Sequence, residues 1–254
     1  MCRSPFSLKP NSFVCFILFC LLSACSGDDD REPVEDSGVG SLEGRVLLHD
    51  AFGIPVANDD MLVSIQDESF RANTAENGTY VFNRVPVGNY ELIFEKEGFG
   101  TFRAQIEHAR SFERGNTRLQ TYFLGQESNT VVRGGTPTFG NNTLEIALAT
   151  IPAGSATNPV YASAFFGKDE TVSNEVNLGV IGPIMFNSGS ANVELEISLE
   201  QLQDFGFVSG ETVHFKVYGD SFHTNEYMTE TGTVHPNVNN SAANFFVSGS
   251  IIIP

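Results

Sequence analysis

The chain has 254 residues, of which 41% are hydrophobic, including 22 Phe but no Trp, and this apolar content excludes a wholly disordered chain. Its 14 basic and 31 acidic side chains give a formal net charge of −17. Nucleic acid is therefore not an expected partner, because phosphate backbones are bound by clusters of Lys and Arg.

The N-terminus carries the features of an export signal. Two basic residues, Arg3 and Lys9, precede an apolar run over residues 13–22. The run is shorter than the roughly 20 residues that a membrane-spanning helix needs, and it has the proportions of a signal-peptide core. All the cysteines lie in this part of the chain, so the remainder is expected to fold without disulfides or thiolate metal sites; they are Cys2, Cys15, Cys20 and Cys25.

The apolar run ends in LSAC, residues 22–25, which resembles a bacterial lipobox. In that motif the signal peptide is cut before the Cys, and the Cys is acylated. The resemblance implies a signal peptide over residues 1–24, lipid attachment (palmitate) at Cys25 and membrane anchoring through the acyl chains. The alternative is an ordinary signal peptide that contains a Cys.

An acidic stretch follows over residues 25–40, with three consecutive Asp at 28–30. Such a segment is too polar to pack and too uniformly charged to collapse, which predicts a solvated tether. It also resembles the acidic export signal that follows the lipidated Cys in surface lipoproteins of Bacteroidota. That resemblance implies the outer face of the outer membrane, whereas a plain spacer would leave the protein on the periplasmic face.

Short strands with turn signals are predicted over residues 41–124. Asn77-Gly78 predicts a hairpin turn, because both residues tolerate positive φ. Basic residues between Lys96 and Arg118 are interspersed with Glu, which indicates a solvated face. Apolar and polar residues alternate around the turn, as in half-buried antiparallel strands; the apolar ones include Tyr80, Phe82, Tyr90, Leu92 and Phe94.

The turn and core residues of this region resemble the carboxypeptidase regulatory-like domain. The resemblance implies a small transthyretin-like β-sandwich that accompanies other domains and performs no catalysis itself. It covers about a third of the chain. The matching residues are Gly44-x-Val46, Gly53-x-Pro55-Val56, Thr74-x-x-Asn77-Gly78-x-Tyr80-x-Phe82, Val85-Pro86-x-Gly88-x-Tyr90 and Gly98-Phe99.

Residues 125–254 are predicted to form a second all-β module. Residues 126–130 and the Gly134-Gly135 pair indicate the boundary, and Gly182-Pro183 predicts an edge strand with a bend. Ser198 and Gln201 have the spacing of a capping box, which predicts one short helix. The order of strand, helix turn and strand is similar to immunoglobulin-like and fibronectin type III sandwiches, although a core Trp is absent. The predicted strands are 144–148, 160–166, 178–186, 193–199, 213–217 and 245–253.

The sequence contains no hydrolase elbow, phosphate loop or metal-ligand spacing, and it predicts no catalytic residue, cofactor or metal. His223 and His235 are expected to meet if the strands flanking their loop pair. With Asp220 and Glu226 nearby, a metal site there is the less favoured alternative. His214 is expected to face solvent.

One polar loop, residues 218–232, contains three aromatic residues, Tyr218, Phe222 and Tyr227. Loops on a rigid sandwich often carry binding sites, and aromatic rings stack on sugar faces. These three residues are therefore the predicted ligand-binding residues. An ordinary hydrated loop is the alternative interpretation.

Three functions are compatible with this pattern. The favoured one is a lipid-anchored, non-enzymatic envelope module that docks a protein partner. The alternative is a surface glycan-binding lipoprotein of a polysaccharide-uptake system. The third, a hydrolase with two carboxylates, would require a pocket that holds two Asp or Glu side chains close together.

Overall fold

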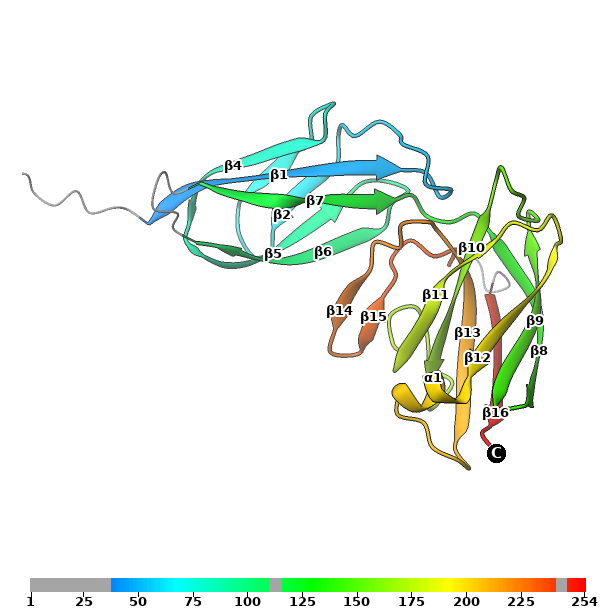
Figure 1. Ribbon diagram of the computed structural model, residues 1–254. Coiled ribbons are helices and arrows are strands. Elements are labelled where there is room, and N and C mark those ends of the chain that lie inside the picture. The colour runs from blue at the N-terminus through cyan, green and yellow to red at the C-terminus, as the bar shows by residue number, and fades with distance from the viewer. Residues whose placement is uncertain (1–37, 110–115, 241–245) are drawn as a thin grey trace, which may run out of the picture. The chain divides into compact units, whose positions relative to one another are not determined.

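The computed structural model describes residues 38–109, 116–240 and 246–254 (Figure 1). The predicted signal peptide, Cys25 and most of the acidic tether lie outside these ranges. The described residues form β-strands and one short helix, which confirms the predicted all-β fold class. Among them, no helix is long and apolar enough to cross a membrane.

The first sandwich has two sheets, with strand orders β4-β1-β7 and β3-β2-β5-β6. All its strand pairs are antiparallel except β1 with β7. Alternating residues of both sheets face a core that includes Val46, Phe82, Leu92 and Phe94. The strands are β1 (Val39–His49), β2 (Leu62–Ile65), β3 (Arg71–Asn73), β4 (Thr79–Pro86), β5 (Gly88–Glu95), β6 (Thr101–His108) and β7 (Thr117–Gly125).

The Asn77-Gly78 turn lies where it was predicted, but it does not join a hairpin. Gly78 has φ +79°, and the strands beside the turn, β3 and β4, belong to different sheets. The reason is a close contact with β1. The Gly78 carbonyl accepts a hydrogen bond from the Val46 amide at 2.9 Å, and a Cβ on Gly78 would lie 1.9 Å from the Val46 carbonyl oxygen. The turn therefore crosses from one sheet to the other.

The second sandwich also has two sheets, with strand orders β11-β10-β13-β16 and β12-β9-β8. Its core includes Ile146, Phe166, Ile197 and Phe215. β11 stands at a sheet edge, as predicted. The strands are β8 (Val131–Gly140), β9 (Thr143–Ile151), β10 (Val160–Gly167), β11 (Gly179–Phe186), β12 (Asn192–Ser198), β13 (Thr212–Asp220) and β16 (Phe246–Ile252), with a separate pair β14 (Tyr227–Thr229) and β15 (Gly232–Val234).

Gly134 and Gly135 do not mark a boundary. They lie inside β8 with φ +87° and +105°, at an irregularity in its pairing with β9 between Gly134 and Thr136. Glycine permits this backbone conformation, so the pair forms a bulge within the strand. Residues 126–130 do connect the last strand of the first sandwich to β8.

The short helix, α1 (Leu199–Asp204), has the predicted capping box. The Ser198 hydroxyl oxygen accepts a hydrogen bond from the Gln201 amide at 3.2 Å, and the Gln201 side-chain oxygen accepts one from the Ser198 amide at 2.9 Å. Leu202 packs into the core from this helix. The two caps satisfy backbone donors that a helix N-terminus leaves without partners.

Candidate functional site

The three predicted ligand-binding residues do not share one exposed face. Tyr218 belongs to β13, is 3% exposed and lies edge-on against Phe165. Phe222 is half exposed, and Tyr227 is partly buried in β14. β13 continues through Asp220, beyond the apolar alternation that predicted it, and this extension places Tyr218 inside the protein.

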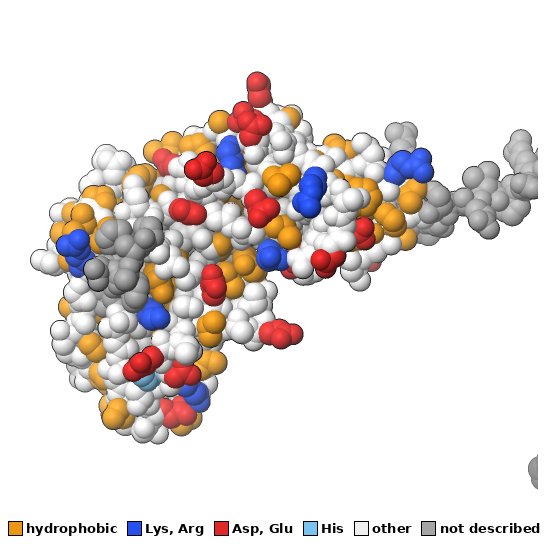
Figure 2. Space-filling model, turned by 180° about the vertical axis from the view of Figure 1, so that it is seen from behind, with side chains coloured by type: hydrophobic (Ala, Val, Ile, Leu, Met, Phe, Trp, Pro, Cys, Tyr) orange, Lys and Arg blue, Asp and Glu red, His pale blue; other side chains and the backbone are white. Residues whose placement is uncertain are grey.

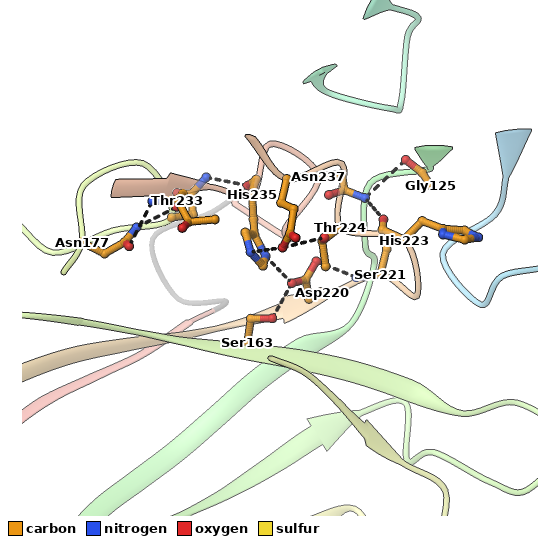
Figure 3. A network of polar contacts seen from close by, with 12 residues as sticks. Gly125, Ser163, Asn177, Asp220, Ser221, His223, Thr224, Thr233, His235 and Asn237 are labelled. Atoms are coloured by element: carbon orange, nitrogen blue, oxygen red, sulfur yellow. Dashed lines mark hydrogen bonds and ion pairs between the residues drawn. The ribbon is translucent and has the colours of Figure 1, made fainter. Parts of the chain in front are cut away.

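A buried polar network lies at the end of β13 (Figure 3). Asp220 accepts hydrogen bonds from the hydroxyl of Ser163 on β10 and from the amide of Ser221. His235 Nδ1 lies 2.9 Å from the same carboxylate oxygen, Oδ2, that Ser163 contacts. The Asp220 and His235 side chains are almost fully buried. The network therefore joins the sheet to the segment that follows β15.

The second ring nitrogen of His235 faces another carboxylate. Nε2 lies 3.4 Å from Glu226 Oε2. Burial alone lowers the pKa of His235, but hydrogen bonds to Asp220 and Glu226, together with their negative charges, raise it to about 9. The hydrogen bond from His235 also lowers the pKa of Glu226. At neutral pH the imidazole is therefore protonated and held between two carboxylates.

This arrangement contains the residue types of a hydrolase triad but not its geometry. Ser163 and His235 both contact Asp220, whereas a nucleophilic Ser needs a neutral His as its base. A protonated His235 cannot take that proton, and Ser163 is fully buried. What the network does in this geometry is link β10, β13 and the segment after β15.

His223 and His235 were expected to meet, but they have different neighbours in the structure. His235 binds the two carboxylates, while His223 lies against His49, with ring centroids 4.5 Å apart. In the part of the chain that the structure describes, no group of three or more His, Cys, Asp or Glu side chains could hold a metal ion. His214, expected to face solvent, is partly buried on β13.

Two buried Asn side chains form what we call the Asn clamp, Asn225 and Asn237. Asn225 accepts a hydrogen bond from the Gly125 amide at 2.7 Å and donates to the carbonyls of Phe99 and Gly125, each at 2.8 Å. Asn237 donates to the carbonyls of Gln126 and His223. The clamp therefore fastens the segment after β13 to the first sandwich and to the 125–126 connection.

The clamp was not predicted. Asparagine is common in exposed loops, and no local sequence pattern distinguishes the buried Asn225 from the Asn residues that are exposed in other loops. The 218–232 loop, whose ligand binding remains a prediction, also contributes this structural contact.

An aromatic row crosses the surface next to the clamp. His223 stacks on Phe123 with centroids 6.0 Å apart and lies edge-on to Phe222 at 4.7 Å. Phe123 is 51% exposed and Phe222 is 49% exposed. Burial and the neighbouring His49 lower the pKa of His223, which favours a neutral ring. We call these four residues, His49, Phe123, Phe222 and His223, the aromatic row.

A second surface feature is an apolar groove of about 560 Å³, which we call the Met228 groove. It lies between residues 167–178, which run from the last residue of β10 through the connection to β11, and residues 228–232 of the β14–β15 hairpin. Val176, Leu178 and Met228 line it and are exposed. The sequence interpretation missed the groove, because its two walls are about 50 residues apart in the chain and only the fold brings them together.

No protein-family model matches the sequence, and no curated protein matches it. Among solved structures, a protein provisionally described as carbohydrate-binding from Bacteroides uniformis is 16% identical, with a TM-score of 0.32 over 84% of this chain and 99% of its own. A DUF3823 family protein from Bacteroides ovatus is 12% identical, with a TM-score of 0.30 over 85% and 100%. The full-length major pilin of Corynebacterium diphtheriae is 12% identical, with a TM-score of 0.28 over 84% and 64%. These scores are too low to support an inference about function.

Proposed function

We propose that the chain is a lipid-anchored, non-enzymatic protein of the bacterial cell envelope that docks a protein partner. The proposed anchor is Cys25, supported by the lipobox-like LSAC and the signal-like run before it. The acidic stretch after Cys25 supports a place on the outer surface of the outer membrane. The acyl chains of the anchor would hold the protein at the membrane even though its negative charge is repelled by anionic lipids.

The Met228 groove is the observation that carries the docking function. Protein-binding surfaces have an apolar centre with a polar rim, and exposed apolar side chains gathered in one place mark such sites. Val176, Leu178 and Met228 provide the centre here, and charged residues line the same groove. By contrast, Ser163, Asp220 and His235 are buried and bonded to one another, which supports a non-enzymatic role.

The test is chemical crosslinking in intact cells of the source organism, followed by purification of the chain and its adducts. The wild type is compared with Cys25→Ala, which removes the proposed lipid attachment point. Cys20→Ala, which lies within the proposed signal peptide, is the matched control. We expect one envelope protein to be recovered with the wild type and with Cys20→Ala, and to be lost with Cys25→Ala. Recovery of nothing above background with the wild type would reject the docking function.

A second candidate function is glycan binding at the aromatic row. Its support is the half exposure of Phe123 and Phe222 on either side of His223, since exposed aromatic rings can stack on sugar faces. A glycan array probed with the purified chain tests it. Binding that is lost in Phe123→Ala, but kept in Val81→Ala at another exposed apolar position, would favour this function.

A further inference from the structure

The walls of the Met228 groove are fixed by hydrogen bonds before any partner binds. The Asn177 amide donates to the Thr231 carbonyl at 3.0 Å, and its side-chain nitrogen donates to the Thr233 carbonyl at 2.8 Å. Gly232 has φ +132°, and a Cβ at this position would lie 2.3 Å from the Asn177 carbonyl oxygen. The hairpin is therefore held closely against the opposite wall. A preformed groove loses little conformational entropy on binding.

The apolar side chains that line the groove are exposed to solvent. Val176 is 41% exposed, Leu178 is 50% exposed and Met228 is 75% exposed. The Thr233 hydroxyl donates to the Met228 sulfur at 3.1 Å, so this long side chain is supported over the hairpin. Asn177 hydrogen-bonds one wall of the groove to the other, and in this arrangement the three side chains remain exposed. Their apolar surface is available to another molecule.

The charges that line the groove are mainly negative. Asp169 and Glu230 line it, and neither makes an ion pair within the described residues. Hydrogen bonds from the Thr171 hydroxyl and amide, and the charge of the nearby His214, lower the pKa of Asp169. Lys168 also lines the groove, but its ammonium lies 2.9 Å from the Glu211 carboxylate. Lys168 is thus already paired, whereas Asp169 and Glu230 have no ion-pair partner in the described part of the chain.

We infer that the Met228 groove binds a segment of the partner protein that carries apolar side chains flanked by Lys or Arg. This inference rests on the proposed docking function and names the chemistry of the partner. Apolar side chains of that segment would cover Val176, Leu178 and Met228, and its basic groups would face Asp169 and Glu230. A second copy of this chain fits less well, because two copies with a formal charge of −17 each repel one another.

The test is a selection of randomised short peptides on the full chain, purified in detergent. We expect the recovered peptides to combine apolar residues with Lys or Arg, and to bind Met228→Glu at least about tenfold more weakly than the wild type. Val208→Glu places the same charge at another exposed apolar residue and should bind as the wild type does. Acidic peptides, equal binding to both variants, or no enrichment over the support alone would overturn the inference.

Acidic side chains are spread over the face shown in Figure 2, so a basic peptide is also attracted to the protein by its overall negative charge. This attraction must be separated from binding in the groove. The double variant Asp169→Asn, Glu230→Gln removes two carboxylates from the groove. Glu194→Gln, Glu196→Gln removes two from exposed positions on β12. We expect the first pair to weaken peptide binding by about tenfold and the second to leave it nearly unchanged. An equal effect of both pairs would assign the attraction to net charge and overturn the inference.

The failure of this inference is distinguishable from failure of the docking function. If Met228→Glu captures the same envelope protein as the wild type in cells, docking stands and the groove is not its site. If the wild type captures nothing, the docking function itself fails. A dimer in sedimentation velocity that Met228→Glu dissociates would identify a second copy as the occupant and overturn the basic-segment inference.

Discussion

At the scale of single residues, the positive charge on His235 connects two parts of the second sandwich. Its ring lies between the buried Asp220 carboxylate and the more exposed Glu226 carboxylate. The sequence placed these three residues in one region but could not show that they bond to one another. Burial of Asp220 depends on how far β13 extends, and local alternation did not predict that extension.

The first prediction concerns the pH dependence of stability. The pKa of His235 is about 9 in the folded protein, against 6.5 for an ordinary His. Its stabilising contribution is therefore fully present below pH 6.5 and is lost as the pH rises through 9. We expect the free energy of unfolding, measured with urea, to fall across this window in the wild type.

The matched variant is His235→Gln. It should flatten the pH dependence and lower the free energy of unfolding near pH 7 by about 3 kcal/mol, because Asp220 loses its charged partner while remaining buried. His214→Gln, at a partly buried position on β13, is the control. A wild-type free energy of unfolding that stays constant or rises from pH 6.5 to 9 would contradict the assignment.

The second prediction concerns the Asn clamp. Asn225→Ala removes three hydrogen bonds and leaves the Gly125 amide without its side-chain partner. We expect the free energy of unfolding to fall by about 3 kcal/mol. Asn142→Ala is the control, because Asn142 is exposed and also has positive φ, +62° against +50° for Asn225. Equal losses in the two variants, measured by urea unfolding, would show that backbone strain alone explains the effect.

At the scale of elements, strands with clean alternation were predicted well. β9 and β12 bury alternate residues that are mostly apolar, and α1 has its predicted cap. β6 was missed because its charged residues were interpreted as a solvated face, although Ala104 and Ile106 do alternate with polar neighbours. β8 was missed because Gly134-Gly135 has the composition of a loop. Local chemistry predicts a strand but does not show which sheet it joins, as the Asn77-Gly78 turn demonstrates.

The third prediction concerns the β14–β15 hairpin. Gly232→Ala should lower the free energy of unfolding by about 3 kcal/mol, since positive φ strains the new residue and its Cβ meets the Asn177 carbonyl. Gly210→Ala should cost about 1 kcal/mol, because Gly210 also has positive φ but faces open space. The loss of the Asn177 contacts should also weaken peptide binding in the groove. Equal destabilisation by both variants in thermal or urea unfolding would contradict the close contact at Gly232.

At the scale of the whole molecule, the all-β class and the β-sandwich fold could be predicted from the sequence. The evidence was the alternation of apolar and polar residues over short segments, with turn-forming residues between them. The candidate site did not follow, because the groove and the clamp each join segments that are distant in the chain. The predicted signal peptide and Cys25 remain predictions. The exposed apolar side chains of the Met228 groove and the excess negative charge are the whole-molecule features on which the proposed docking function rests.

A partner protein that docks in the Met228 groove must come within reach of the Met228 side chain. The most direct test replaces Met228 by a photo-crosslinking amino acid in the otherwise wild-type chain and irradiates intact cells. Val208, another exposed apolar residue, is replaced in the same way as the control. We expect one envelope protein to be captured at position 228 and not at position 208, and we expect this capture to fall in the Asp169→Asn, Glu230→Gln background. Equal capture at both positions, or none at position 228, would contradict this expectation.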